Sequence, residues 1–151
     1  MAETNTKDAP TIDYWHLYVG EDGISRNRRC TMTEFEQKSI SGDAAPQWIG
    51  REHESRTTVL FTVLPEGWIG EWHENPGPQW IVPLSGRWFV EAMDGSRVEM
   101  GPGDISFGAD QGCRTVDGCK GHLSGTVGDA PCHLMLIQLD AAPEGAGCPF
   151  K

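Results

Sequence analysis

Short runs of β-branched and aromatic residues, each closed by glycine, proline or an Asp-Gly pair, recur along most of the chain. The clearest run is 57–64, TTVLFTVL, which Pro65, Glu66 and Gly67 end. Glycine and proline supply 19 and 10 of the 151 residues, and no stretch carries the apolar stripe of an amphipathic helix. Strands are predicted at 14–19, 57–64, 79–84, 88–93, 105–107, 123–127 and 132–139. The pattern predicts an all-β fold, an antiparallel barrel or jelly roll.

The length fits a single domain with its own core. We expect a flexible N-terminal tail at 1–10, the barrel at 11–140 and a loosely held C-terminal tail at 141–151. Within the barrel, 25–54 has a poor strand pattern and is expected to form an arm or a dimerisation segment. Exposed strand edges and a tryptophan-rich apolar face favour a homodimer.

The charge balance restricts the partners. Acidic residues number 22 against 12 basic ones, which gives a formal net charge of −10. Nucleic acid and anionic membrane surfaces bind mainly basic patches, so we exclude both as partners. No apolar run has the length of a membrane span, and the start of the chain lacks a signal-peptide pattern, so a cytoplasmic location is expected. The five cysteines contain no C-x-x-C pair and are expected to be reduced thiols.

The segment 67–79, GWIGEWHENPGPQ, concentrates polar side chains. On an extended strand Glu71, His73 and Asn75 would share one face. A Pro-Gly-Pro break then redirects the chain to Gln79, which opens the next predicted strand. Polar groups that converge from neighbouring strands are typical of a site in the mouth of a small barrel, so we expect a small-molecule substrate or ligand here.

This spacing resembles the first motif of the cupin family: Gly, five residues, His-x-His, three or four residues, Glu, six residues, Gly. On this chain the motif begins at Gly67 and ends at Gly86, with His73 as its first histidine. Asn75 stands in place of the second histidine and Gln79 in place of the glutamate. The frame is retained while two of the three ligands differ.

A second cupin motif is similar to 100–107, MGPGDISF, where a Pro-Gly-Asp turn leads into a strand. The last metal-binding histidine of the family then matches His122, after a longer loop at 110–120 that contains two cysteines and is expected to be a mobile lid. The resemblance covers about 57–139 and implies one small cupin barrel of the cupin 2 type.

The resemblance implies a mononuclear divalent metal, Fe, Ni, Mn, Co or Zn, held by His73, Gln79 and His122. Asn75 or Glu71 would be a weak fourth ligand. The implied function is a metal-assisted dioxygenase, lyase, decarboxylase or isomerase acting on a small oxygenated or aromatic compound. No nucleotide cofactor is expected, because the Gly-Pro-Gly turn lacks the lysine and helix of a phosphate loop.

Two metal-free alternatives stay open. In the first, His73 or His122 is a general acid or base that Glu71 or Asp110 orients. In the second, the barrel only binds or senses a small ligand. Asn75 and Asp110 are predicted to lie in the substrate pocket under either alternative.

Six tryptophans are present, most of them around the first motif. Trp80 and Trp88 are predicted to line the pocket. Trp68 and Trp72 would fall on the strand face opposite the motif histidine, where core or interface packing is expected.

Overall fold

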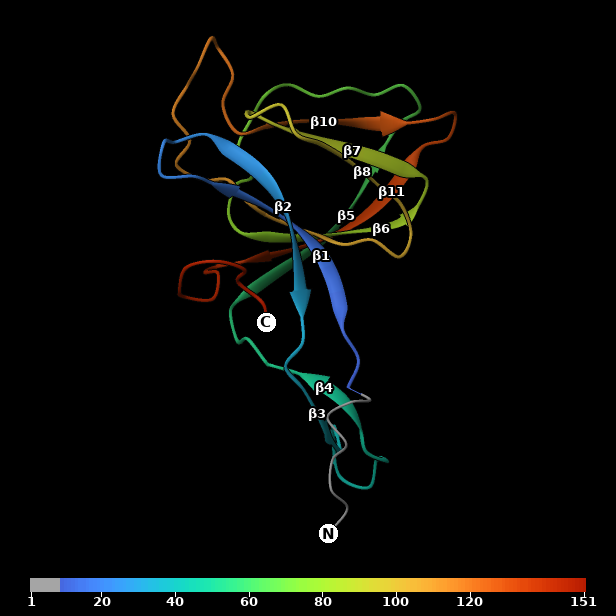
Figure 1. The fold of residues 1–151 in the computed structure, drawn as a ribbon. Coiled ribbons are helices and arrows are strands. Elements are labelled where there is room, and N and C mark those ends of the chain that lie inside the picture. The colour runs from blue at the N-terminus through green and yellow to red at the C-terminus, as the bar shows by residue number, and fades with distance from the viewer. Residues whose placement is uncertain (1–8) are drawn as a thin grey trace.

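The computed structural model describes residues 9–151, so most of the predicted N-terminal tail lies outside the described residues. Eleven strands and no helix make up the described secondary structure (Figure 1). The described part of the chain accordingly offers no helix long and apolar enough to cross a membrane. The strands are β1 (Ile12–Val19), β2 (Ser25–Met32), β3 (Phe35–Lys38), β4 (Gln47–Gly50), β5 (Thr57–Leu64), β6 (Gln79–Ser85), β7 (Arg87–Ala92), β8 (Arg97–Met100), β9 (Ser106–Ala109), β10 (His122–Val127) and β11 (Cys132–Leu139).

The all-β prediction is confirmed, and the sheets are of the barrel or jelly-roll class. A six-stranded sheet has the order β2-β1-β9-β6-β11-β5, and a three-stranded sheet has the order β10-β7-β8. Figure 1 shows the smaller sheet stacked over part of the larger one. Strand pairs are antiparallel except β1 with β9, which run parallel. The prediction of antiparallel strands is therefore wrong for this pair.

The main core lies between the two sheets. Trp88 and Val90 of β7 are each 2% exposed and pack in one cluster with Ile81 of β6 and Leu134 of β11. These residues occupy alternate strand positions, so each strand gives one apolar face to the core. The cavity described below opens at the edge of this cluster.

A second cluster covers part of the outer face of the larger sheet. Tyr14 and Phe107 are buried there beneath Phe150 of the C-terminal segment. The ring centroids of Phe107 and Phe150 lie 5.0 Å apart, and the Tyr14 hydroxyl donates to the Phe150 carbonyl at 2.8 Å. The prediction of a loosely held tail at 141–151 is therefore wrong for the last residues of that segment.

A disulfide between Cys30 and Cys148 joins β2 to the same C-terminal segment across 118 residues of sequence. The prediction of reduced thiols is wrong for this pair. No local sequence spacing indicates a bond between two cysteines that are so far apart in the chain. Cys113, Cys119 and Cys132 are free thiols, as predicted.

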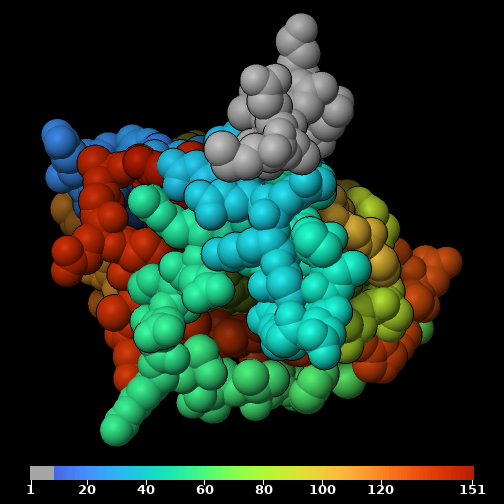
Figure 2. Space-filling model, turned by 90° about the horizontal axis from the view of Figure 1, so that it is seen from below, coloured from blue at the N-terminus to red at the C-terminus, as the bar shows by residue number. Residues whose placement is uncertain are grey.

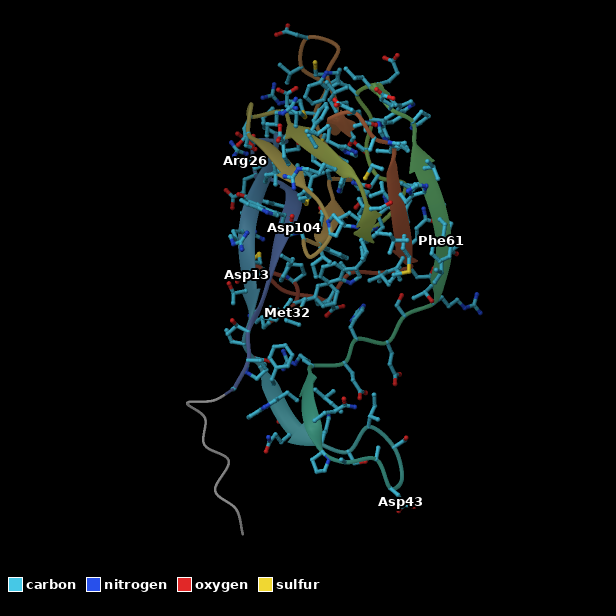
Figure 3. The ribbon with its side chains drawn as sticks, turned by 90° about the vertical axis from the view of Figure 1, so that its right-hand side faces the viewer. Asp13, Arg26, Met32, Asp43, Phe61 and Asp104 are labelled. Atoms are coloured by element: carbon cyan, nitrogen blue, oxygen red, sulfur yellow. A yellow bond between two sulfur atoms is a disulfide. The ribbon has the colours of Figure 1, made fainter. Side chains whose placement is uncertain are left out.

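The poorly patterned segment 25–54 separates into two parts. Its first part is β2, which pairs along its whole length with β1. Its second part is a β3–β4 hairpin that projects from the two larger sheets with Asp43 at its far end (Figure 3). In Figure 2 the hairpin, in cyan and teal, stands beside the red C-terminal segment.

The edge strand β5 carries an exposed apolar face. Val59, Phe61 and Val63 alternate along it and are 55%, 68% and 51% exposed. Figure 3 places Phe61 on the side of the molecule away from Asp13. An exposed apolar face on an edge strand is where partner association is expected.

The predicted homodimer can be tested on this face. If the dimer forms here, Phe61→Ser should raise its dissociation constant at least tenfold, because burying a phenylalanine contributes about 2 kcal/mol. Sedimentation velocity across a concentration series measures the change. Ile69→Ser is the matched control, since Ile69 is 65% exposed outside this face. A wild-type chain that is monomeric at every concentration would contradict the prediction.

Acid should destabilise the folded protein through His16. This side chain is 6% exposed, and burial together with the charge of Arg28 lowers the pKa of His16 to about 4. The unfolded chain has a histidine pKa near 6.5 and so binds the proton more readily. The free energy of unfolding should fall between about pH 6.5 and pH 4, by at most about 1.4 kcal/mol per pH unit.

Urea unfolding at several pH values measures this effect. His16→Gln should flatten the acid limb, whereas His133→Gln, at an exposed histidine, should leave it unchanged. Identical acid limbs in the wild type and His16→Gln would contradict the assignment.

Candidate functional site

A cavity of about 120 Å³ is lined by residues of both sheets and of the connection between β5 and β6. Its polar side chains come from four segments: the connection, β6, β10 and β5. They are His73, Asn75, Gln79, His122, Ser124 and Thr62. The structure therefore brings the three predicted metal ligands and Asn75 into one cavity.

Apolar side chains form the rest of the wall. Leu64, Ile81, Leu134 and Leu136 line it from the larger sheet, and Trp68 and Trp88 add two indoles. Trp88 lies where it was predicted.

The backbone pairs the two histidines directly. His73 N donates to His122 O at 3.0 Å and His122 N donates to His73 O at 2.9 Å, which places the ring centroids 4.6 Å apart. Gly121 permits this approach, because it has a φ of 78° and a Cβ there would overlap the His73 carbonyl. The connection is thereby held against the first residue of β10.

Outside this pairing, the connection is not the extended strand that the sequence predicted. Its bridges are isolated ones, at Ile69 and His73, and it carries several glycines and prolines. Side chains along it do not alternate, so Trp68 lines the same cavity as His73 instead of the opposite face.

Asp110 orients the His122 ring. The carboxylate is fully buried and accepts a 2.7 Å hydrogen bond from His122 Nδ1. Burial opposes ionisation, but hydrogen bonds from His122 and Asn75 outweigh it and hold the pKa of Asp110 below its ordinary value. With the Nδ1 proton committed to Asp110, neutral His122 carries a lone pair on Nε2.

A backbone carbonyl orients His73. Its Nδ1 donates to the Glu71 carbonyl oxygen at 2.6 Å, so Nε2 again carries the lone pair in the neutral ring. The Glu71 side chain is exposed and absent from the cavity lining. The orienting role predicted for Glu71 therefore belongs to its backbone and not to its carboxylate.

The amides at the two altered motif positions bond to each other. Asn75 donates to Asp110 through its backbone N at 2.9 Å and through Nδ2 at 2.8 Å. Gln79 Nε2 donates to Asn75 Oδ1, and Gln138 Nε2 donates to Gln79 Oε1 at 3.1 Å. A relay thus runs from Gln138 through Gln79 and Asn75 to Asp110.

A divalent metal fits this donor set poorly. Catalytic metal sites take three or more protein ligands, commonly with a negative charge among them. Here both ends of the Gln79 amide are bonded, and the Asp110 carboxylate serves His122 and Asn75. Residues 9–151 contain no group of three His, Cys, Asp or Glu side chains that could hold a metal. The two Nε2 atoms of His73 and His122 remain as the available strong donors.

Two predicted pocket residues lie outside the lining. Trp80 points to the outer face, where its ring centroid is 4.6 Å from that of Phe150. Asp110 lies behind His122 instead of facing the cavity. Ser124 was missed, although strand alternation two residues after His122 could have found it.

The cysteine-containing loop is anchored, in contrast to the mobile lid that was predicted. Cys113 N donates to Glu74 Oε1 at 3.1 Å, and Lys120 Nζ lies 3.4 Å from the same atom. Arg114 N donates to the Gly23 carbonyl at 2.9 Å. Burial raises the pKa of the Cys113 thiol.

Comparison with known proteins adds no relative: no family model matches the chain, and no curated protein matches it. The cupin assignment therefore stays a resemblance based on motif spacing.

Restoring the family ligands should create a metal site. We expect wild-type protein equilibrated with Zn²⁺ and then desalted to retain far less than one equivalent, whereas Asn75→His/Gln79→Glu should retain about one, because it regains an imidazole and a carboxylate. Elemental analysis measures both, with circular dichroism to verify the fold. Full retention by the wild type, lost in His73→Ala and His122→Ala, would instead support the metal-site hypothesis.

Proposed function

We propose that the cavity is a metal-free acid–base site in which His122 moves a proton to and from a small organic molecule. The observation that carries this proposal is the 2.7 Å hydrogen bond from His122 Nδ1 to the fully buried Asp110. A carboxylate in this position holds the ring, keeps a proton on Nδ1 and stabilises the imidazolium that forms when Nε2 takes a proton. These are the properties that a general base requires.

His73 supplies a second proton-transfer group. Its ring centroid lies 4.6 Å from that of His122, and its Nδ1 proton is bonded to the Glu71 carbonyl. Two imidazoles beside one cavity can take a proton from one atom of a substrate and return it to another. Isomerisation needs only such proton transfers, and elimination needs them together with departure of a protonated leaving group, so one of these is the reaction type we propose.

The cupin-like motif spacing supports this proposal in part, because isomerases and lyases occur in that family. Fold analogy alone does not select a reaction. The relay through Gln79 and Asn75 favours the metal-free alternative over the metal-assisted one, since it occupies the amides that a metal would need. A barrel that only binds its ligand would show binding without proton transfer.

Hydrogen–deuterium exchange tests the proposal without knowledge of the product. Wild-type protein in D₂O should catalyse exchange at a carbon of at least one member of a panel of small ketones, lactones and hydroxy acids, followed by ¹H NMR. His122→Gln and Asp110→Asn should each slow this exchange roughly 100-fold or more.

The control is His133→Gln, at an exposed histidine that is bonded to Ser85 and does not line the cavity. Its exchange rate should equal that of the wild type. Equal rates in wild type and His122→Gln would falsify the general-base role, and binding without any exchange would favour the sensing alternative.

A further inference from the structure

Ser124 is a polar residue of the cavity wall that neither histidine engages. It lines the cavity and is only 6% exposed. Its carbonyl accepts from Gly70 N at 2.9 Å. Its hydroxyl is not one of the buried unpaired side-chain atoms of residues 9–151, so it stays accessible from the cavity. A hydroxyl that the cavity can reach offers one donor and two acceptor lone pairs to a molecule bound there.

Strand geometry places this hydroxyl beside the proposed base. Ser124 follows His122 by two residues on β10, so both side chains project from the same face, with their Cα atoms about 7 Å apart. The pairing of β10 with β7 sets both residues opposite inward-facing Val90 and Ala92. One small molecule can therefore contact the hydroxyl and the imidazole together.

The charge of the wall restricts what this molecule can be. None of the twelve lining residues is Lys, Arg, Asp or Glu, and Leu64, Ile81 and Leu134 are among the apolar ones. The nearest carboxylate identified behind the wall, Asp110, would repel an anion. A cation would lose its hydration while the Asp110 carboxylate already accepts three hydrogen bonds from Asn75 and His122, so an uncharged ligand is favoured.

On the basis of the proposed acid–base function, we infer that the cavity takes an uncharged carbonyl compound whose oxygen accepts a hydrogen bond from Ser124. His122 Nε2 removes a proton from the carbon next to the carbonyl, so that a C–H bond breaks and an N–H bond forms. The released electron pair becomes the carbon–carbon double bond of an enolate, and the carbonyl π electrons move to oxygen. Return of the proton to the same carbon, on either face, re-forms the carbonyl group and regenerates the base, and no oxidant or reductant is required.

Ser124 is thus assigned as a catalytic residue that touches the substrate oxygen. Its hydrogen bond strengthens as negative charge develops on that oxygen, so Ser124 should affect the rate more than binding. This split between binding and rate is what a purely structural serine would not show.

Three probes with one ring test the ligand class: cyclohexanone, cyclohexanecarboxylate and cyclohexylammonium. Binding to wild-type protein is followed by ¹⁵N-edited NMR titration, and exchange of the ketone α-protons in D₂O is followed by ¹H NMR. Cyclohexanone should bind at least tenfold more tightly than either ion. Ser124→Ala should weaken its binding about threefold to tenfold and slow exchange about 100-fold. Ser106→Ala is the matched control, because Ser106 is a buried strand serine outside the cavity lining.

The outcomes separate this inference from the proposed function. If His122→Gln abolishes exchange but Ser124→Ala matches the wild type in binding and rate, the Ser124 inference is overturned while the general base stands. If Ser124→Ala weakens ketone binding but the wild type shows no exchange, the carbonyl ligand stands and the proposed reaction is overturned. Preference for either ion, or no binding of the ketone, overturns the ligand class.

Discussion

The carboxylate of Asp110 has no exposed surface, and such a group is stable only where hydrogen bonds replace the water it has lost. Here the donors come from two segments that are distant in sequence. Asn75 donates twice from the connection between β5 and β6, and His122 donates from the start of β10. The buried charge of Asp110, which directly follows β9, therefore links the connection between β5 and β6 to the start of β10. Ring orientation at His122 is a consequence of satisfying this charge.

The same constraint explains why the two altered motif positions belong together. An asparagine can donate to Asp110 with its nitrogen and accept from Gln79 with its oxygen, as Asn75 does. A glutamate at position 79 could not donate a hydrogen bond to the Asn75 side-chain oxygen, and its carboxylate would add a second negative charge near Asp110. The amides at these two positions and the ionised Asp110 thus form one compatible set. Replacing either amide with a family ligand alone would break the relay.

Runs rich in β-branched and aromatic residues that a proline or glycine turn ends could be predicted as strands from sequence, as 57–64 shows. The β2 strand was missed because it lies at a sheet edge and carries charged residues such as Arg28, which mask alternation. Motif spacing predicted that His73 would share a site with the later histidine. It could not predict the Cys30–Cys148 bond, which depends on contacts 118 residues apart.

The strand β6 connects the cavity to the C-terminal segment, because neighbouring residues on it face opposite sides of the sheet. Gln79 points inward to the relay, and Trp80 points outward to Phe107 and Phe150, with ring centroids 4.9 and 4.6 Å away. A shift of β6 by one residue would exchange these two side chains and break both arrangements. The aromatic packing on the outer face and the hydrogen bonds inside therefore specify the same strand register. The C-terminal segment contributes to the geometry of a cavity that it does not line.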